Sequence, residues 1–261
     1  MTKPTALVTG ASVGIGHAFA RELAARGFGV VVVARDVERL KSLAALIEGS
    51  HDVAVEILAA DLTDSEALAI VERRLADSTR PIEMLVNNAG FGSFGHFSDL
   101  DVDGEARMVE LNVTALLRLT HAALPGMIAR RSGSVLNVSS LAGFQPSARV
   151  ATYGATKAFV TSFTQSIHEE VLGTGVKVSA LCPGFTRTEF QDRSGAAGIR
   201  LPDFVWQTPE HVAALALDAL DQNKAVFIPG VLNKVTGYIA DALPGAFTRK
   251  ATNLLSKRLK H

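Results

Sequence analysis

The stretch TALVTGASVGIG, residues 5–16, joins an apolar run of strand length to a glycine-rich turn. Its glycines permit a tight turn, a close approach of the backbone to a ligand and close contact between strand and helix. A strand, a glycine-rich turn and a helix in this order predict the first unit of a parallel α/β sheet. The helix that follows has an apolar stripe of four residues at helical spacing, which are Ala18, Phe19, Leu23 and Ala24.

Further apolar runs rich in β-branched residues recur along the chain, with amphipathic segments between them. Most of the runs are almost continuously apolar, which is typical of strands buried on both faces of a parallel sheet. The sequence therefore predicts an α/β fold, a single domain over residues 1–261 with a doubly wound parallel sheet of about seven strands flanked by helices. With the first run at 5–10, the predicted strands lie within residues 29–35, 53–62, 82–90, 134–140, 176–184 and 225–230.

Composition excludes several classes of function. The 261 residues carry 26 basic and 26 acidic side chains, and this zero net charge gives no general attraction to nucleic acid or acidic lipid. The one cysteine rules out an intrachain disulfide and, with the lack of a secretory signal pattern, leads us to expect a cytoplasmic protein. The seven histidines have no metal-ligand spacing, so no metal site is predicted.

The glycine-rich turn is the first element of a predicted dinucleotide site. A helix that begins at about Gly14 presents its free N–H groups and the positive end of its dipole to a pyrophosphate. The alternative is a plain turn between strand and helix, which becomes less favoured at the first strand of an alternating α/β chain. The residues expected to contact the cofactor here are Gly10, Ser12, Gly14, Ile15 and Gly16.

The end of the second strand distinguishes the two nicotinamide dinucleotides. An acidic residue there would bind the ribose 2′-hydroxyl, but the sequence has Arg35, whose guanidinium can hold a 2′-phosphate. Arg39, one turn later, is placed to assist, and Asp36 has the position of a helix cap. The sequence thus favours NADP(H), the alternative being that Arg35 is a surface charge at a strand end.

Polar and small residues also follow the third and fourth strands. Asp61, beside Leu62, is placed to accept a hydrogen bond from the adenine amino group. Asn88, Ala89 and Gly90 suit a backbone that passes close to a nucleotide. For both groups, ordinary turn and cap chemistry is an equally open alternative.

Six separated motifs together resemble one known family. TGASVGIG, NNAG, LNVTA, SVLNVSS, YGATK and PGFTRT occur in the order and approximate spacing of the classical short-chain dehydrogenase/reductases, over about residues 5–190. Within that family, the ARDVERL run and the tail are most similar to NADP-linked oxoacyl reductases of broad specificity. The resemblance implies a Rossmann-type fold and an oxidoreductase that transfers a hydride between NADP(H) and a hydrophobic carbonyl or alcohol.

The resemblance also implies roles for a catalytic set. Tyr153 is the expected general acid/base, and Ser140 is expected to orient the substrate oxygen. Lys157, four residues after the tyrosine on the same helix face, would bind the nicotinamide ribose and favour the phenolate. Lowering the phenol pKa by ~3 units needs about 4 kcal/mol, which a close cation beside oxidised nicotinamide would supply. Asn112 matches the asparagine that helps hold a relay water, the alternative being a kink or packing residue in a long helix.

The sixth strand supplies the last expected cofactor contacts. Pro183 and Gly184 make the turn after it, and Thr188 matches the threonine that bonds the nicotinamide carboxamide in the family. Two other functions stay open beside the reductase. One is a catalytically silent NADP(H) sensor or scaffold, which the intact tyrosine, lysine and serine disfavour. The other is a reductase recruited to membranes by its tail.

Substrate contacts are expected from aromatic loops and from a lid. Residues 190–207 are the predicted lid, and packing of the lid against the body is the alternative role for its rings. Residues 231–261 form a predicted helical extension that ends in a basic amphipathic helix. Packing of this helix on the body or a second subunit is favoured over membrane contact, and the family resemblance implies a homodimer or homotetramer. The aromatic residues of these loops are Phe91, Phe94, Phe144, Phe185, Phe190, Phe204 and Trp206.

Overall fold

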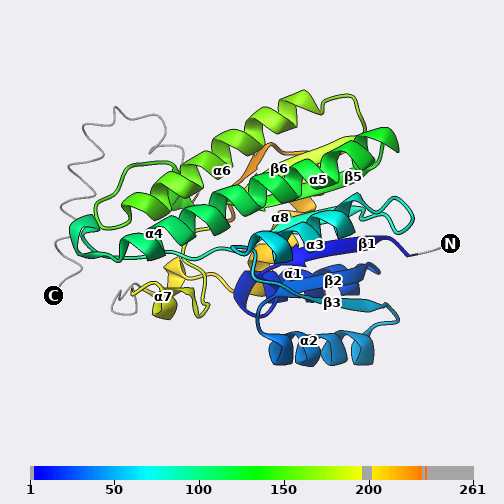
Figure 1. Ribbon diagram of the computed structural model, residues 1–261, viewed down its shortest axis with the longest axis horizontal. Helices are drawn as coiled ribbons and strands as arrows, with labels where there is room; N and C mark the ends of the chain where they lie inside the picture. Colours follow the sequence, from blue (N-terminus) through cyan, green and yellow to red (C-terminus); the bar gives the residue numbers. More distant parts are fainter. Residues whose placement is uncertain (1–2, 196–201, 231–232, 234–261) are drawn as a thin grey trace.

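The computed structural model describes residues 3–195, 202–230 and 233. Within this part of the chain, seven parallel strands form a sheet in the order β3-β2-β1-β4-β5-β6-β7 (Figure 1). Each predicted apolar run contains one strand, so the predicted doubly wound α/β fold is confirmed. The strands are β1 (Thr5–Thr9), β2 (Gly29–Ala34), β3 (Val55–Ala59), β4 (Met84–Asn87), β5 (Gly133–Val138), β6 (Val176–Leu181) and β7 (Val226–Phe227).

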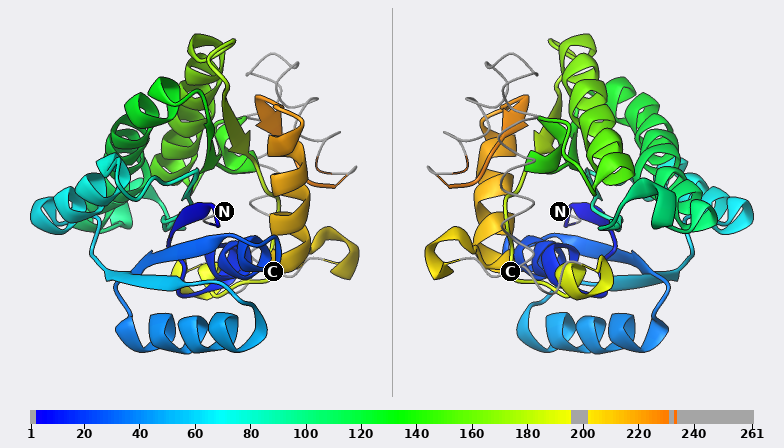
Figure 2. Two further views of the ribbon diagram at one scale, coloured as in Figure 1. Left: turned by 90° about the vertical axis from the view of Figure 1, so that its right-hand side faces the viewer. Right: turned by 90° about the vertical axis from the view of Figure 1, so that its left-hand side faces the viewer.

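Helices cover both faces of the sheet. One face is packed by α1 (Gly14–Ala25), α2 (Val37–Ser50) and α8 (Pro209–Asp221). The other is packed by α3 (Ser65–Ala76), α5 (Leu116–Ala129) and the end of α6 (Ala151–Glu170). Figure 2 separates the green helices from the orange α8. The shorter helical elements are α4 (Val102–Val109), η2 (Glu110–Ala115), η1 (Phe97–Asp99), η3 (Leu141–Gly143), α7 (Phe190–Arg193) and η4 (Asp203–Val205).

The strand β2 shows why both faces need cover. Val30 and Val32 pack into one hydrophobic core, whereas Val31 and Val33 pack into the core on the opposite face. Successive side chains of a strand point to opposite faces, so an unbroken valine run is stable only between two helical layers. The predicted apolar stripe of α1 is confirmed, because all four of its members are buried.

The helix caps agree in part with the sequence pattern. Asp36 accepts a hydrogen bond from the backbone N–H of Arg39 at 3.0 Å, which confirms it as the cap of α2. The helix α1 begins at Gly14 as predicted, but the residue before it, Val13, provides no side-chain cap. The first N–H groups of α1 therefore have no side-chain acceptor from the capping position.

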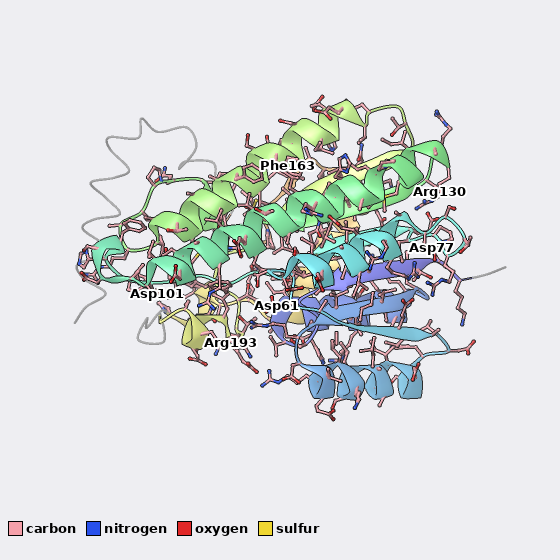
Figure 3. The ribbon with its side chains drawn as sticks, in the orientation of Figure 1. Asp61, Asp77, Asp101, Arg130, Phe163 and Arg193 are labelled. Atoms are coloured by element: carbon pink, nitrogen blue, oxygen red, sulfur yellow. The ribbon has the colours of Figure 1, made fainter. Side chains whose placement is uncertain are left out.

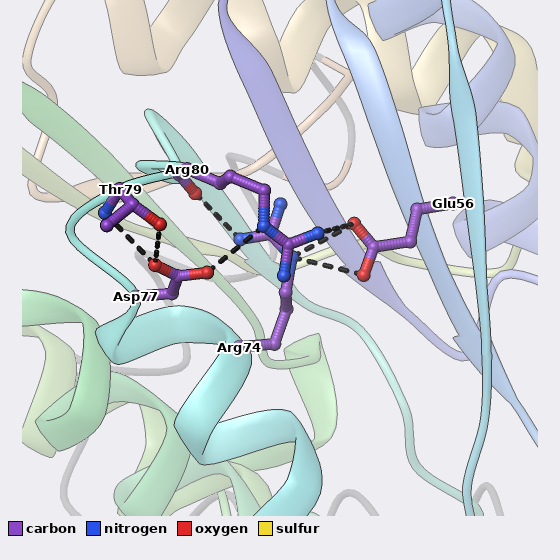
Figure 4. Close-up of polar contacts among 5 residues, drawn as sticks. All are labelled: Glu56, Arg74, Asp77, Thr79 and Arg80. Carbon is purple, nitrogen blue, oxygen red and sulfur yellow. Dashed lines mark hydrogen bonds and ion pairs between the residues drawn. The ribbon is translucent and has the colours of Figure 1, made fainter.

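At the amino end of the sheet, between β3, α3 and the loop that leads to β4, charged side chains form a network (Figure 4). The buried guanidinium of Arg74 donates from Nε to both carboxylate oxygens of Glu56, at 3.0 and 3.1 Å, and from Nη1 to the carbonyl of Arg80 at 2.7 Å. Arg80 contacts Asp77, whose carboxylate also accepts two hydrogen bonds from Thr79. Every charge in this network has an opposite charge or a hydrogen-bond partner.

Two predicted regions fall partly or wholly outside the described residues. The predicted lid, residues 190–207, contains α7 and η4, but residues 196–201 are not described. The predicted C-terminal extension, residues 231–261, lies outside the described residues except for Asn233. In the described part of the chain, the helices are too short or too polar to cross a membrane.

Candidate active site

The glycine-rich turn folds against the end of β4. Gly10 has a φ of 66°, a backbone conformation that residues with a side chain rarely adopt. The side-chain amide of Asn88 donates to the carbonyls of Thr9 at 2.9 Å and Gly10 at 3.3 Å. A Cβ on Gly16 would run into the Gly10 carbonyl and the Asn88 amide. The turn can therefore be this tight only with glycine at these two positions.

This turn fits a dinucleotide pyrophosphate. The first turn of α1 has no acidic residue and no side-chain cap, so its N–H groups and positive dipole end can face an anion. Ser12 lies in the turn, and Ile15 lies in the first turn of the helix. A Cβ on Gly14 would lie 3.0 Å from Cγ2 of Thr188, so the loop after β6 closes over the same helix end. The structure thus brings together predicted cofactor residues that are far apart in sequence.

Arg35 and Asp61 meet at the ends of β2 and β3. The Arg35 side chain is 75% exposed, and its Nη1 lies 3.6 Å from Oδ2 of Asp61. Asp61 also accepts hydrogen bonds from the backbone N–H and the hydroxyl of Thr63. Burial acts to raise the pKa of Asp61, but the Thr63 hydrogen bonds and the Arg35 charge outweigh it and hold the pKa below its ordinary value. The side chain of Leu62 is buried in the core, which leaves its backbone for any ligand contact.

The loop after β4 connects the nucleotide side to the catalytic side. The N–H groups of Asn88 and Ala89 donate to the hydroxyl of Thr9, at 2.9 and 3.0 Å. A Cβ on Gly90 would lie 2.9 Å from Oδ1 of Asn112 and 3.6 Å from Nζ of Lys157. Glycine at position 90 therefore lets this loop lie against both predicted catalytic residues.

Ser140, Tyr153 and Lys157 meet where β5 ends beside α6. The phenol of Tyr153 is hydrogen-bonded to the side chain of Ser140. Nζ of Lys157 lies 5.8 Å from the centre of the Tyr153 ring and donates to the carbonyl of Val138 at 2.8 Å. The neighbouring Ser139 is turned away from the phenol, and its buried hydroxyl donates to the α6 backbone at the Lys157 carbonyl. The three residues that the family resemblance implies as a catalytic set therefore lie together in the structure.

The protein groups by themselves shift the pKa of the phenol upward, whereas the lowering expected from the sequence also involves an oxidised nicotinamide. Burial raises the pKa of Tyr153 to about 12, and the hydrogen bond with Ser140 opposes this shift only in part. Burial also lowers the pKa of Lys157 to about 8. A buried lysine loses its proton more easily than one in water, and the pKa of the phenol is set by burial and the Ser140 hydrogen bond, of which burial is the larger influence. At neutral pH the tyrosine is a protonated donor.

Asn112 lies in the π-helical segment η2, which interrupts the long helix formed by α4 and α5. Its amide donates to the carbonyl of Phe91 at 2.9 Å and to the hydroxyl of Thr156 at 3.1 Å. Its Oδ1 accepts the N–H of Phe91 at 3.1 Å. Asn112 therefore lies at an irregular point of a long helix, and π turns are frequent at functional sites. The predicted relay role stays a prediction.

The loop after β6 holds the remaining predicted residues. The carbonyl of Pro183 accepts a hydrogen bond from the N–H of Leu141 at 3.1 Å, which ties this loop to the one after β5. A Cβ on Gly184 would lie 2.6 Å from the side chain of Asn233. The hydroxyl of Thr188 accepts the N–H of Phe190 at 3.2 Å. Asn233 was not among the predicted site residues, and no local sequence signal marks it.

Of the aromatic residues predicted to contact substrate, one lies against Tyr153 and two others pack against each other. The Phe190 ring lies 5.4 Å from the Tyr153 ring, and a Cβ on Gly92 would touch both rings. Phe185, which precedes the predicted lid, and Trp206, which belongs to it, pack edge to face at 5.6 Å, which supports the alternative role, packing of the lid against the body. The sequence marks Phe190 as a substrate-loop aromatic, but only the fold reveals its contact with Tyr153.

Among the described residues, no group of three or more histidine, cysteine or carboxylate side chains could hold a metal ion. The parallel sheet, the glycine-rich turn at its switch point and a tyrosine beside a buried lysine instead define a dinucleotide-dependent class of oxidoreductase.

The comparisons identify the family within that class. The model of the short chain dehydrogenase family matches residues 4–197, and the chain belongs to this family. It is 38% identical to a short-chain dehydrogenase from Sphingobium yanoikuyae in complex with NADPH, with a TM-score of 0.82 over 93% of this chain and 97% of that chain. It is 34% identical to the bulky-bulky ketone specific alcohol dehydrogenase from Comamonas testosteroni, with a TM-score of 0.79 over 94% and 97% of the two chains.

A curated relative adds a third similarity. The very-long-chain 3-oxoacyl-CoA reductase-A of Danio rerio is 32% identical, over 90% of this chain and 73% of its own length. As a member of the short chain dehydrogenase family, the protein is an oxidoreductase that uses a nicotinamide dinucleotide to interconvert alcohols and carbonyl compounds.

Proposed function

We propose that the protein reduces a hydrophobic ketone with NADPH, and that Tyr153 supplies the proton. The observation that carries this proposal is the phenol of Tyr153, hydrogen-bonded to Ser140 and backed by the buried ammonium of Lys157. Two hydroxyl groups then converge on one point at the carboxyl end of β5. A catalytically silent sensor has no need of this arrangement.

The protein residues would act in a definite order. The hydroxyl of Ser140 orients the carbonyl oxygen of the substrate toward the phenol. When bound, the reduced nicotinamide supplies a hydride to the carbonyl carbon. The phenolic proton of Tyr153 moves to the carbonyl oxygen, which gives the alcohol and a phenolate. The ammonium of Lys157 stabilises that phenolate, and its pKa of about 8 allows it to pass a proton on near neutral pH.

The remaining cofactor contacts follow from the turn and the strand ends. The glycine-rich turn and the start of α1 would hold the pyrophosphate, and Lys157 would reach the nicotinamide ribose. Thr188, beside Gly14, would bond the carboxamide. Arg35 has an exposed guanidinium at the end of β2, where a 2′-phosphate would lie, and the NADPH complex of the Sphingobium relative supports the same preference.

The substrate is proposed to be a ketone with bulky apolar groups. Phe190 lies against Tyr153, and Phe91 and Phe94 belong to the loop that Asn112 holds in place. Apolar and aromatic walls around a few polar groups are typical of sites for hydrophobic small molecules. The 34% identity to an alcohol dehydrogenase specific for bulky-bulky ketones supports this class.

A homodimer or homotetramer is also proposed. Leu117 and Ile128 on α5 and Phe159 on α6 are exposed, although each is a large apolar side chain. Phe159 stacks on Phe163 at 5.6 Å on the outer face of α6. These exposed large apolar side chains on α5 and α6 support the proposal of a subunit interface.

The decisive experiment is a substrate screen that follows NADPH absorbance with aromatic ketones, steroid ketones and acyl thioesters. Wild type should reduce a bulky hydrophobic ketone. Tyr153→Phe, which removes one hydroxyl, should lower turnover by roughly 10²- to 10⁴-fold. NADPH affinity, measured by equilibrium titration, should stay the same in this variant. Unchanged turnover in Tyr153→Phe would refute the proposed acid/base role.

A further inference from the structure

An ion pair crosses the proposed cofactor site. Arg39, in the first turn of α2, donates from Nη1 to both carboxylate oxygens of Glu189, at 2.9 and 3.1 Å. Arg39 follows β2 and Glu189 follows β6, and these strands lie on opposite sides of β1 in the sheet. The glycine-rich turn follows β1, so the ion pair passes over the edge where that turn lies. Figure 3 marks this end of the sheet with Asp61 and Arg193.

Three consecutive residues at this point contact three parts of the site. Thr188 lies against Gly14, Glu189 pairs with Arg39, and the ring of Phe190 lies against Tyr153. A change in the position of Glu189 would therefore also move the adjacent Phe190, whose ring lies against the phenol of Tyr153.

The other contacts of the pair are local. Glu189 also accepts a hydrogen bond, at 2.5 Å, from Arg193 in α7. Nε of Arg39 lies 3.4 Å from Asp36, the cap of its own helix. The Arg39 guanidinium holds the pKa of Glu189 below its ordinary value, so the carboxylate is charged at neutral pH.

The pair has the chemistry of a phosphate contact. A guanidinium binds carboxylate and phosphate oxygens with the same planar pair of N–H groups. The side chains of Arg39 and Glu189 are 43% and 46% exposed, and an exposed pair of this kind is weak enough for a competing anion to displace. A phosphate carries more negative charge than a carboxylate, and it would repel Glu189 if both stayed near Arg39.

We propose that Glu189 is a cofactor-specificity residue: it occupies Arg39 in place of the 2′-phosphate of NADP(H), and the phosphate displaces it. The displacement frees the segment that holds Phe190 against Tyr153. A dinucleotide without the 2′-phosphate leaves the ion pair intact and Phe190 in place. This inference rests on the proposed use of NADP(H).

The test uses adenosine 2′,5′-bisphosphate and adenosine 5′-monophosphate as probes in calorimetric titrations of the full chain. Glu189→Gln should bind the bisphosphate about two- to fivefold more tightly than wild type, the range expected from loss of one exposed competing ion pair. Binding of the monophosphate should not change. The matched control is Glu38→Gln, which removes the same charge from a glutamate paired with Lys41 on the same helix as Arg39.

The outcomes separate this inference from the proposed function. If Arg35→Gln and Arg39→Gln both leave bisphosphate affinity unchanged, the proposed NADP(H) site is wrong. If those variants weaken the bisphosphate while Glu189→Gln behaves like Glu38→Gln, the site stands and the role of Glu189 is wrong. Thermal unfolding of each variant confirms that the chain is folded.

Hydrogen–deuterium exchange tests the effect on Phe190. The bisphosphate should speed amide exchange in residues 190–194 of wild type, and the monophosphate should not. In Glu189→Gln, exchange of the same amides should already be fast without a ligand. Unchanged or slower exchange in wild type with the bisphosphate would overturn the link between the ion pair and Phe190.

Discussion

The two ends of the parallel sheet hold their buried cations in opposite ways. At the amino end, the guanidinium of Arg74 is matched by the carboxylate of Glu56 and by a backbone carbonyl. At the carboxyl end, the ammonium of Lys157 donates to the carbonyl of Val138, and the described residues place no carboxylate within ion-pair distance of it. Burial therefore lowers the pKa of Lys157 to about 8.

This difference separates a stabilising cation from a reactive one. A buried cation that is fully paired resists change in its protonation and holds its neighbours in place. A buried cation without a counter-charge loses its proton easily and attracts any negative charge that forms nearby. The first arrangement serves the fold, and the second suits a site where a phenolate forms during the reaction.

Replacing the reactive cation should have the largest effect. Lys157→Met should lower turnover by about a hundredfold or more, because no cation then stabilises the phenolate. The same change should raise stability at pH 7. The shift in pKa from 10.5 to about 8 means that the buried ammonium destabilises the wild-type fold by about 3 kcal/mol, which the variant avoids. The variant also loses the hydrogen bond to Val138, which offsets about 1 kcal/mol of that gain.

The pH dependence of that stability gain checks its cause. The folded pKa lies below the unfolded one, so the destabilisation is complete below pH 8 or so and disappears as the pH rises to about 10.5. Thermal unfolding of wild type and Lys157→Met across this range should therefore converge. If Lys157→Met is less stable than wild type at pH 7, the prediction is wrong and Lys157 stabilises the fold as Arg74 does.

The opposite result is expected at the amino end. Arg74→Met should lower the free energy of unfolding by about 2–3 kcal/mol, because it leaves the Glu56 carboxylate without its main donor. Turnover should not change, since this network lies at the far end of the sheet from Tyr153. Denaturant unfolding and the NADPH assay on the same preparation measure both quantities. A fall in turnover without a fall in stability would show that Arg74 acts in the reaction, which contradicts its assignment as a stabilising cation.

A smaller effect is expected from the exposed arginines at each end. Arg35→Asp should shift the ratio of NADPH to NADH affinity by about tenfold toward NADH, because one charged contact to the 2′-phosphate is lost. Its stability should change little, since the Arg35 side chain is 75% exposed. Arg80→Asp, at the amino end, makes the same change at another exposed arginine and should leave the ratio as it is. An unchanged ratio in Arg35→Asp would refute the 2′-phosphate role.

Most of the fold and the centre of the site could be predicted because their signals are local. An unbroken valine run predicts β2, and the glycine spacing predicts a helix that begins at Gly14. The side chain of Asp36 caps the helix that its position indicates. The resemblance to the short-chain dehydrogenase/reductases implies Ser140, Tyr153 and Lys157 as a set, and the strand and helix do bring these residues together.

The contacts that tertiary structure alone decided join segments distant in sequence. The sequence shows Arg39 and Glu189 as two charges 150 residues apart, and only the order of the strands sets them at 2.9 Å. The phenol pKa of Tyr153 likewise depends on how much of its surroundings the fold buries, and burial outweighs the hydrogen bond with Ser140. Sequence thus determined the strands, the turns and the reactive residue types, because periodicity and capping are local. The fold determined charge pairing and burial, because both depend on which distant side chains share one low-dielectric space.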